Sequence, residues 1–82
     1  MDLYSIKIIC NGYMNKKKGF TAEIDNYNED AERITFDVRI LKCGAFRASQ
    51  PMWISKKSEL TAESQLSSQI GQFSASVENN RI

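Results

Sequence analysis

The chain of 82 residues contains no histidine and only one proline, four glycines and two cysteines. Without histidine it lacks the commonest general base and the commonest metal ligand, so Ser-His-Asp and Cys-His arrangements are excluded. No apolar run approaches the ~18 residues of a membrane span, the N-terminus shows no signal peptide, and no glycine-rich phosphate loop is present. The sequence therefore predicts a cytoplasmic protein that is not an enzyme, takes no cofactor or metal and has no membrane partner.

A strong excess of charge is also missing, because 11 basic and 10 acidic residues give a net charge of +1. General nucleic-acid binders usually carry a basic excess, since contacts to phosphate dominate their affinity. The charges are nevertheless grouped. Lys16, Lys17 and Lys18 form a basic cluster, and the segment 25–32 is acidic. The balance argues against non-specific binding to nucleic acid and directs attention to these local groups.

The two cysteines, Cys10 and Cys43, do not form a C-x-x-C pair. In a chain without an export signal, we expect free, reduced thiols with a structural role, and a disulfide or a reactive thiol is the alternative. The strand pattern described next would place the two sulfur atoms on opposite sides of a sheet.

Alternation of apolar and polar residues predicts strands in the first half of the chain. The pattern runs through residues 4–10, where Tyr4, Ile6, Ile8 and Cys10 are apolar, and it returns at 20–25 and most clearly at 33–40. Short connections between such strands indicate an antiparallel meander. Residues 45–50 are a candidate further strand, with Phe46 and Ala48 on one face. Pro51 must end that strand or place it at an edge.

The last third of the chain predicts a helix over about 58–78. Ser58 is the expected N-cap, and Gly71 leaves open whether residues 72–78 continue the helix or form a last strand. Residues 79–82 are expected to be a frayed tail. The opposite face of the helix is uncharged and rich in Ser and Gln. The predicted apolar stripe consists of Ala62, Leu66, Ile70, Phe73 and Val77.

Together these segments predict a single domain over residues 1–82 of the α+β class. Its expected architecture is a three- to four-stranded antiparallel sheet over about 3–50, with one C-terminal helix packed on one face. A single helix leaves the other face of the sheet without cover. That face predicts contact with a partner, and a homodimer is a separate hypothesis.

Three groups of residues are candidates for binding such a partner. The lysine cluster lies at an expected hairpin tip, where a solvated turn is the structural alternative. Trp53 is either a hydrophobic plug between sheet and helix or an exposed interface anchor. The uncharged Ser and Gln face of the helix is the third candidate, because it can be desolvated at low cost. The predicted partner-binding residues are Lys16, Lys17, Lys18, Arg47, Trp53 and Lys57.

The acidic residues Asp25, Glu29, Asp30 and Glu32 are interpreted as a solvated turn. A site for a hard cation is the alternative, although the segment lacks the spacing of an EF-hand loop.

We therefore expect a non-enzymatic binding protein that occupies a surface of a larger protein or nucleoprotein partner, as a regulator or inhibitor. Small, histidine-free, charge-balanced domains without a catalytic set are typical of phage-encoded inhibitors of host defence, anti-CRISPR proteins included. The alternative is a nucleic-acid-binding regulator, although Phe20 and Phe36 fall on the core side of their strands and leave a poor stacking platform. Its candidate residues are Lys16, Lys17, Lys18, Arg33 and Arg39.

Overall fold

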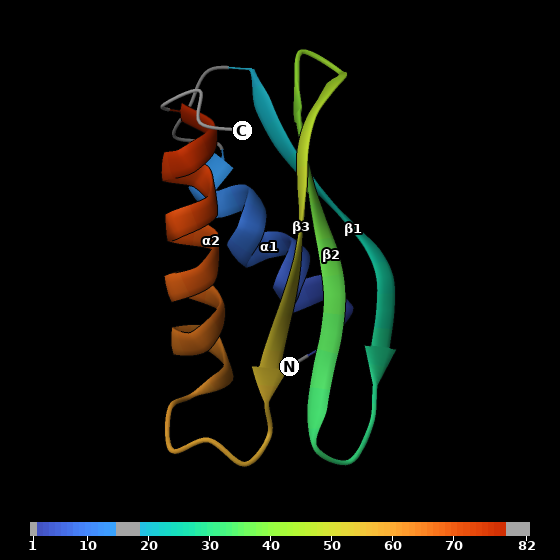
Figure 1. Cartoon of the computed structure of the whole chain (residues 1–82), viewed down its shortest axis with the longest axis vertical. Helices are drawn as coiled ribbons and strands as arrows, with labels where there is room; N and C mark the ends of the chain where they lie inside the picture. Colours follow the sequence, from blue (N-terminus) through green and yellow to red (C-terminus); the bar gives the residue numbers. More distant parts are fainter. Residues whose placement is uncertain (1, 15–18, 79–82) are drawn as a thin grey trace.

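The elements follow the order helix, three strands, helix in the computed structural model, which describes residues 2–14 and 19–78 (Figure 1). The predicted lysine tip at 16–18 and the predicted tail at 79–82 lie outside the described residues. The strands form an antiparallel sheet in the order β1-β2-β3, which confirms the predicted α+β meander. The elements are α1 (Leu3–Met14), β1 (Phe20–Glu29), β2 (Arg33–Lys42), β3 (Ala45–Ser55) and α2 (Ala62–Glu78).

The predicted first strand is wrong, because residues 4–10 belong to helix α1. Asp2 caps this helix: its Oδ1 accepts a hydrogen bond from the Ser5 backbone N–H at 2.8 Å. Side chains spaced four residues apart then form a buried stripe, made by Ile6, Cys10 and Met14. The cap and this spacing are both present in the sequence, and together they favour a helix over a strand.

The alternating pattern over 4–10 has a different origin from the one expected. Helix α1 is apolar on its solvent side as well as on its core side. Tyr4 is 72% exposed and Ile8 is 55% exposed, whereas Ile6 and Cys10 are fully buried. Because consecutive even positions fall alternately on the two sides of the helix here, the pattern imitates the period of a strand.

Both helices pack on one side of the sheet (Figure 1). The alternation predicted for β2 is confirmed, because Ile34, Phe36, Val38 and Ile40 are all at most 2% exposed. They join the buried side chains of α1, β3 and α2 in one hydrophobic core. We call this side of the sheet the covered face. Its core side chains supply the main favourable term for folding.

Helix α2 begins four residues later than predicted, and Thr61 replaces Ser58 as the cap. The Ser64 backbone N–H donates to Thr61 Oγ1 at 3.1 Å, while Ser58 Oγ accepts from Leu60 in the preceding loop. The helix continues through Gly71 to Glu78, so residues 72–78 are helical. No helix among the described residues is long and apolar enough to cross a membrane.

Amide side chains from the helices occupy part of each free edge of the sheet. Gln69 donates to the Trp53 carbonyl at 2.7 Å and accepts from the Trp53 N–H at 3.2 Å. Gln65 makes the same pair of bonds with Ser55: it donates to the Ser55 carbonyl at 3.0 Å and accepts from the Ser55 N–H at 2.8 Å. Asn11 of α1 donates to the Ala22 carbonyl of β1 at 3.1 Å and accepts from the Ala22 N–H at 3.0 Å. Each of these amide clasps satisfies backbone groups that a further strand would otherwise use.

The clasps also account for part of the uncharged Ser and Gln face of α2. Gln65 was expected to face an external partner, but its amide is bonded to β3 of its own sheet. Pro51 also protects this edge. The β2–β3 register runs without a shift from Ser55 to Ala48, so it places the Pro51 ring nitrogen toward the same edge, where it has no N–H to donate.

Both cysteines are free thiols, as expected, but the predicted geometry is wrong. Cys10 lies in α1, and burial raises the pKa of its thiol to about 12, which makes it a structural core residue. Cys43 is exposed in the turn between β2 and β3, where it has φ of 52° beside Gly44 at 83°. The two positive φ values match the type I′ turn of tight hairpins.

Candidate functional site

The side of the sheet opposite the helices has no helix or strand over it within the described residues (Figure 1). We call it the open face. The register fixes its rows, because each side chain of β2 lies between its partners on β1 and β3. The open face consists of Thr21, Glu23, Asp25, Asn28, Arg33, Thr35, Asp37, Arg39, Leu41, Phe46, Ser49, Pro51, Trp53 and Ser55.

Two aromatic side chains stand on the open face about half exposed. Trp53 is 50% exposed and Phe46 is 56% exposed. Each has an arginine from β2 over its ring, with Arg33 at 5.9 Å from the Trp53 centroid and Arg39 at 5.5 Å from the Phe46 centroid. Such cation–π pairs hold the rings in place on the sheet. Trp, Phe and Arg are also residue types enriched in protein interfaces.

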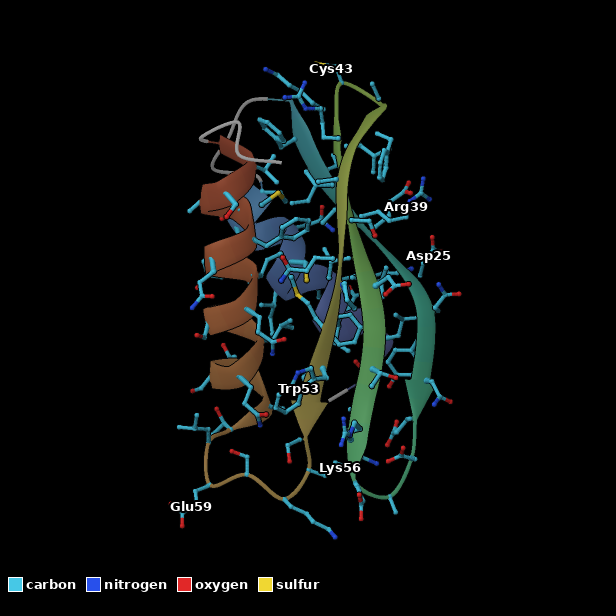
Figure 2. All side chains as sticks on the ribbon, in the orientation of Figure 1. Asp25, Arg39, Cys43, Trp53, Lys56 and Glu59 are labelled. Atoms are coloured by element: carbon cyan, nitrogen blue, oxygen red, sulfur yellow. The ribbon has the colours of Figure 1, made fainter. Side chains whose placement is uncertain are left out.

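Three carboxylates lie beside these aromatics, near the middle of the open face. Arg39 Nη1 is 3.4 Å from Glu23 Oε1 and 3.4 Å from Asp25 Oδ2. Figure 2 shows Arg39 and Asp25 on the side of the sheet away from the helices. Asp25 is directly opposite Asp37, whose Oδ2 accepts a hydrogen bond from Asn26 at 2.7 Å. This part of the surface is therefore net negative.

Two irregularities shape the open face. One extends the β1 strand between Asp25 and Asn28, where Asn26 has φ of 53°. The other makes Arg47 the extra residue of β3, between Phe46 and Ala48. Bulges re-aim side chains, and here the second one separates Phe46 from Ala48. The predicted common face of these two residues is wrong, since Ala48 is buried and Phe46 is exposed on the other side.

The acidic segment 25–32 is built into strand β1 and the β1–β2 hairpin. Asp30 Oδ1 accepts the backbone N–H groups of Arg33 and Glu32, and these bonds hold the pKa of the Asp30 carboxyl below its ordinary value. Glu29 Oε2 is 2.5 Å from Lys56 Nζ, and that bond lowers the pKa of Glu29. Among the described residues no three side chains of the His, Cys, Asp or Glu type are grouped as metal ligands.

The structure brings together only some of the predicted binding residues. Trp53 lies beside Arg33, which was predicted for nucleic acid, and Lys57 follows β3 with its Nζ 3.3 Å from Glu32 Oε1. Arg47 lies six residues before Trp53 on β3, or about 20 Å along an extended strand. Arg47 and Trp53 are therefore far apart on β3, Lys57 lies beyond its end, and the three residues do not form one cluster.

Sequence reasoning missed Phe46 and Pro51 as members of this surface, whereas the alternation of β2 already placed Asp37 on the outward side with Arg33 and Arg39. The sequence did contain a signal for Pro51. If an edge strand continues through this proline, Pro51 and Trp53 are two residues apart and therefore lie on the same face of the sheet. The position of Phe46 depends on the bulge at Arg47, for which the sequence has no clear mark.

A second, smaller apolar exposure lies on the solvent side of α1, at Tyr4 and Ile8. It is separate from the open face, since α1 packs on the covered side of the sheet. These two residues therefore supply a control surface of comparable exposure.

Comparison with protein-family models, with curated proteins and with solved structures finds no match for this chain.

Proposed function

We propose that this protein is a non-enzymatic binding protein that occupies a protein surface through its open face, as a small regulator or inhibitor. The observation that carries the proposal is the pair of half-exposed aromatics, Trp53 and Phe46, on a sheet face with no cover among the described residues. We also propose a cytoplasmic setting, which the two free thiols support.

The partial occupation of both sheet edges favours the open face as the binding surface. A partner strand adds to a sheet through unpaired backbone N–H and C=O groups. Gln65 and Gln69 already use those groups of Ser55 and Trp53, and Asn11 uses those of Ala22. Binding through side chains of the face remains, and Trp53 and Phe46 supply the large apolar contact area that anchors such interfaces.

The charge of the open face favours protein over nucleic acid. Arg33 and Arg39 have the aromatic neighbours that a base-stacking surface needs. However, Glu23, Asp25 and Asp37 outnumber them on the same face, and carboxylates repel the phosphate backbone. Arg39 is also engaged by two of these carboxylates.

The test is capture of the tagged protein with its partner from a lysate of its source cells, with and without nuclease, read by mass spectrometry. We expect a discrete protein that survives nuclease and is lost with the double variant Trp53→Ser and Phe46→Ser. The matched control is Tyr4→Ser with Ile8→Ser, which removes two apolar side chains of at least similar exposure from α1 and should retain the partner.

Replacement of Lys16, Lys17 and Lys18 by alanine addresses the alternative. The proposal predicts that Trp53→Ala weakens binding more than this triple change, with modest salt dependence. Recovery of nucleic acid, steep loss of binding with salt, or dominance of the lysine variant would overturn the proposal in favour of a nucleic-acid regulator.

A further inference from the structure

The open face is divided lengthwise into two strips of different chemistry. The acidic strip is Glu23, Asp25 and Asp37, on β1 and the neighbouring part of β2. The aromatic strip is Phe46, Pro51 and Trp53, all on β3. Both strips run along the strands, because Glu23 and Asp25 are two residues apart on β1 and the three members of the aromatic strip share one strand.

The acidic strip is incompletely neutralised by the described residues. Arg39 lies within 3.4 Å of Glu23 and of Asp25. Asp37 receives a neutral amide from Asn26 at 2.7 Å. One guanidinium group thus contacts two of the three carboxylates, and the three carboxylates exceed it by two negative charges.

The position of Asp37 also costs stability. Like charges directly opposite one another on neighbouring strands are destabilising, and Asp25 and Asp37 are such a pair. The polar uncharged side chains found elsewhere on this face, such as Thr35 and Ser49, would keep the surface hydrated without that repulsion. Asp37 accepts one hydrogen bond, from the neutral amide of Asn26, and its charge beside Asp25 would still attract a cation from outside.

We infer that the open face binds a basic amphipathic helix of a protein partner. Its apolar side chains would pack on the aromatic strip, and its Lys or Arg side chains would lie over Asp25 and Asp37. This inference rests on the proposed function and names the chemistry of the partner.

The shape of the surface fits a helix. With ~3.3 Å per residue and ~4.8 Å between strands, a face of three strands of ten, ten and eleven residues measures about 33 by 14 Å. A helix of about 20 residues is ~30 Å long and 10–12 Å wide. The amide clasps and Pro51 oppose the other common mode, addition of a strand at the edge.

A second copy of this chain fits less well. Its open face would carry the same excess of carboxylates, so that two copies face to face would bring net negative surfaces together. The complementary surface has to be positive, which argues for a different protein.

The experiment titrates the ¹⁵N-labelled full chain with two synthetic amphipathic peptides of 20 residues. One has a leucine face flanked by lysine, and the other has the same leucine face flanked by glutamate. We expect the lysine peptide to bind at least about tenfold more tightly, with shift changes confined to β1, β2 and β3. The variant Asp25→Asn with Asp37→Asn should abolish most of this difference. Glu59→Gln, a change of an exposed carboxylate in the loop before α2, should leave it unchanged.

Equal or tighter binding of the glutamate peptide, no binding of either peptide, or shift changes centred on Tyr4 and Ile8 would overturn the inference. Its failure can be told apart from failure of the proposed function. A lysate partner that depends on Trp53 and Phe46, together with no preference for the lysine peptide, would keep protein binding and reject the basic helix. A lysate partner that does not depend on Trp53 and Phe46 would reject both the proposed function and the basic helix as its ligand.

Discussion

The two faces of the same sheet are made by alternate residues of the same three strands, yet they differ in what surrounds them. On β2, Phe36 and Val38 are buried under both helices, while their neighbours Asp37 and Arg39 belong to the open face. The covered face is apolar along β2 from Ile34 to Ile40. The open face mixes carboxylates, arginines and two large aromatics.

This difference teaches that the open face is not simply the polar back of a half-buried sheet. An antiparallel sheet with one solvated side normally alternates apolar and polar residues. The open face departs from that rule at Phe46 and Trp53, and it carries the unfavourable pair of Asp25 and Asp37. Residues that do not help the fold indicate a role outside it.

The largest expected effect contrasts one aromatic from each face. Phe36→Ala should lower the free energy of unfolding by roughly 3–5 kcal/mol, because it leaves a cavity in the core. Trp53→Ala should lower it by about 1 kcal/mol or less, since half of the Trp53 side chain is already in water. Urea denaturation of both variants measures the difference. If both variants lose the same free energy of unfolding, Trp53 is the hydrophobic plug between sheet and helix, which is the alternative given in the sequence analysis.

The next effect concerns the edge that separates the two faces. Gln65→Ala with Gln69→Ala removes four hydrogen bonds to β3 and should lower the free energy of unfolding by about 2 kcal/mol or more. The opened edge should also promote self-association, which sedimentation would detect. Gln72→Ala, on the exposed side of the same helix, is the control. A double variant as stable and monomeric as the control would show that the amide clasps contribute little.

A smaller effect of opposite sign is expected on the open face. Asp37→Asn removes the repulsion from Asp25 and should raise the free energy of unfolding by a few tenths of a kcal/mol. The same change should weaken binding of a basic helix. Thermal denaturation and peptide titration of one sample measure both quantities. A loss of stability would mean that the charge of Asp37 supports the fold, and the contrast between the faces would weaken.

The smallest effect is the dependence on pH. The pKa values of Glu29 and Asp30 are lowered in the folded state, by the Lys56 bond and by backbone N–H groups respectively. Their contribution to stability is therefore complete above their ordinary values of 4.5 and 3.8 and is lost as the pH falls below them. Asp30→Asn retains an oxygen acceptor without a charge, so its melting temperature should fall less between pH 6 and about 3. Parallel profiles for the variant and the original chain would contradict this assignment.

At alkaline pH the dependence has the opposite sign, because stability falls as the pH rises. Burial raises the pKa of Cys10 to about 12, so the unfolded chain ionises first. Stability should be unaffected by this thiol below its ordinary value of 9.0 and should fall as the pH rises from there toward 12. Cys10→Val, which retains an apolar side chain at this position, should remove that part of the alkaline decline.

Local patterns in the sequence predicted the elements whose apolar residues follow a single periodicity, that of a strand or that of a helix. The alternation of Ile34 through Ile40 and the stripe from Leu66 to Val77 identified β2 and α2, because each buries a single side. Helix α1 was missed because Tyr4 and Ile8 are apolar but exposed. Together with the buried residues on the other side of the helix they give the alternating pattern of a strand. Trp53 was found from its residue type. Phe46 was missed as part of the surface, because a bulge sets its direction.

Contacts between distant residues could not be predicted in this way. The bonds between Gln69 and Trp53 join positions 16 apart in sequence, and those between Asn11 and Ala22 join positions 11 apart. Nothing in the neighbours of Gln69 distinguishes it from Gln72, which is exposed. The charge of the open face likewise became visible only when the register placed Asp25 opposite Asp37.

The amide clasps have a consequence for the order of folding. The meander can form from local contacts, whereas α1 and α2 come from the two ends of the described chain and reach the sheet only by docking. Until they dock, the backbone groups of Ala22, Trp53 and Ser55 are open to strands of other molecules. The interval between formation of the sheet and docking of the helices is therefore when newly made chains are most prone to aggregate. Pro51 protects the middle of the β3 edge throughout that interval, because its protection needs no partner.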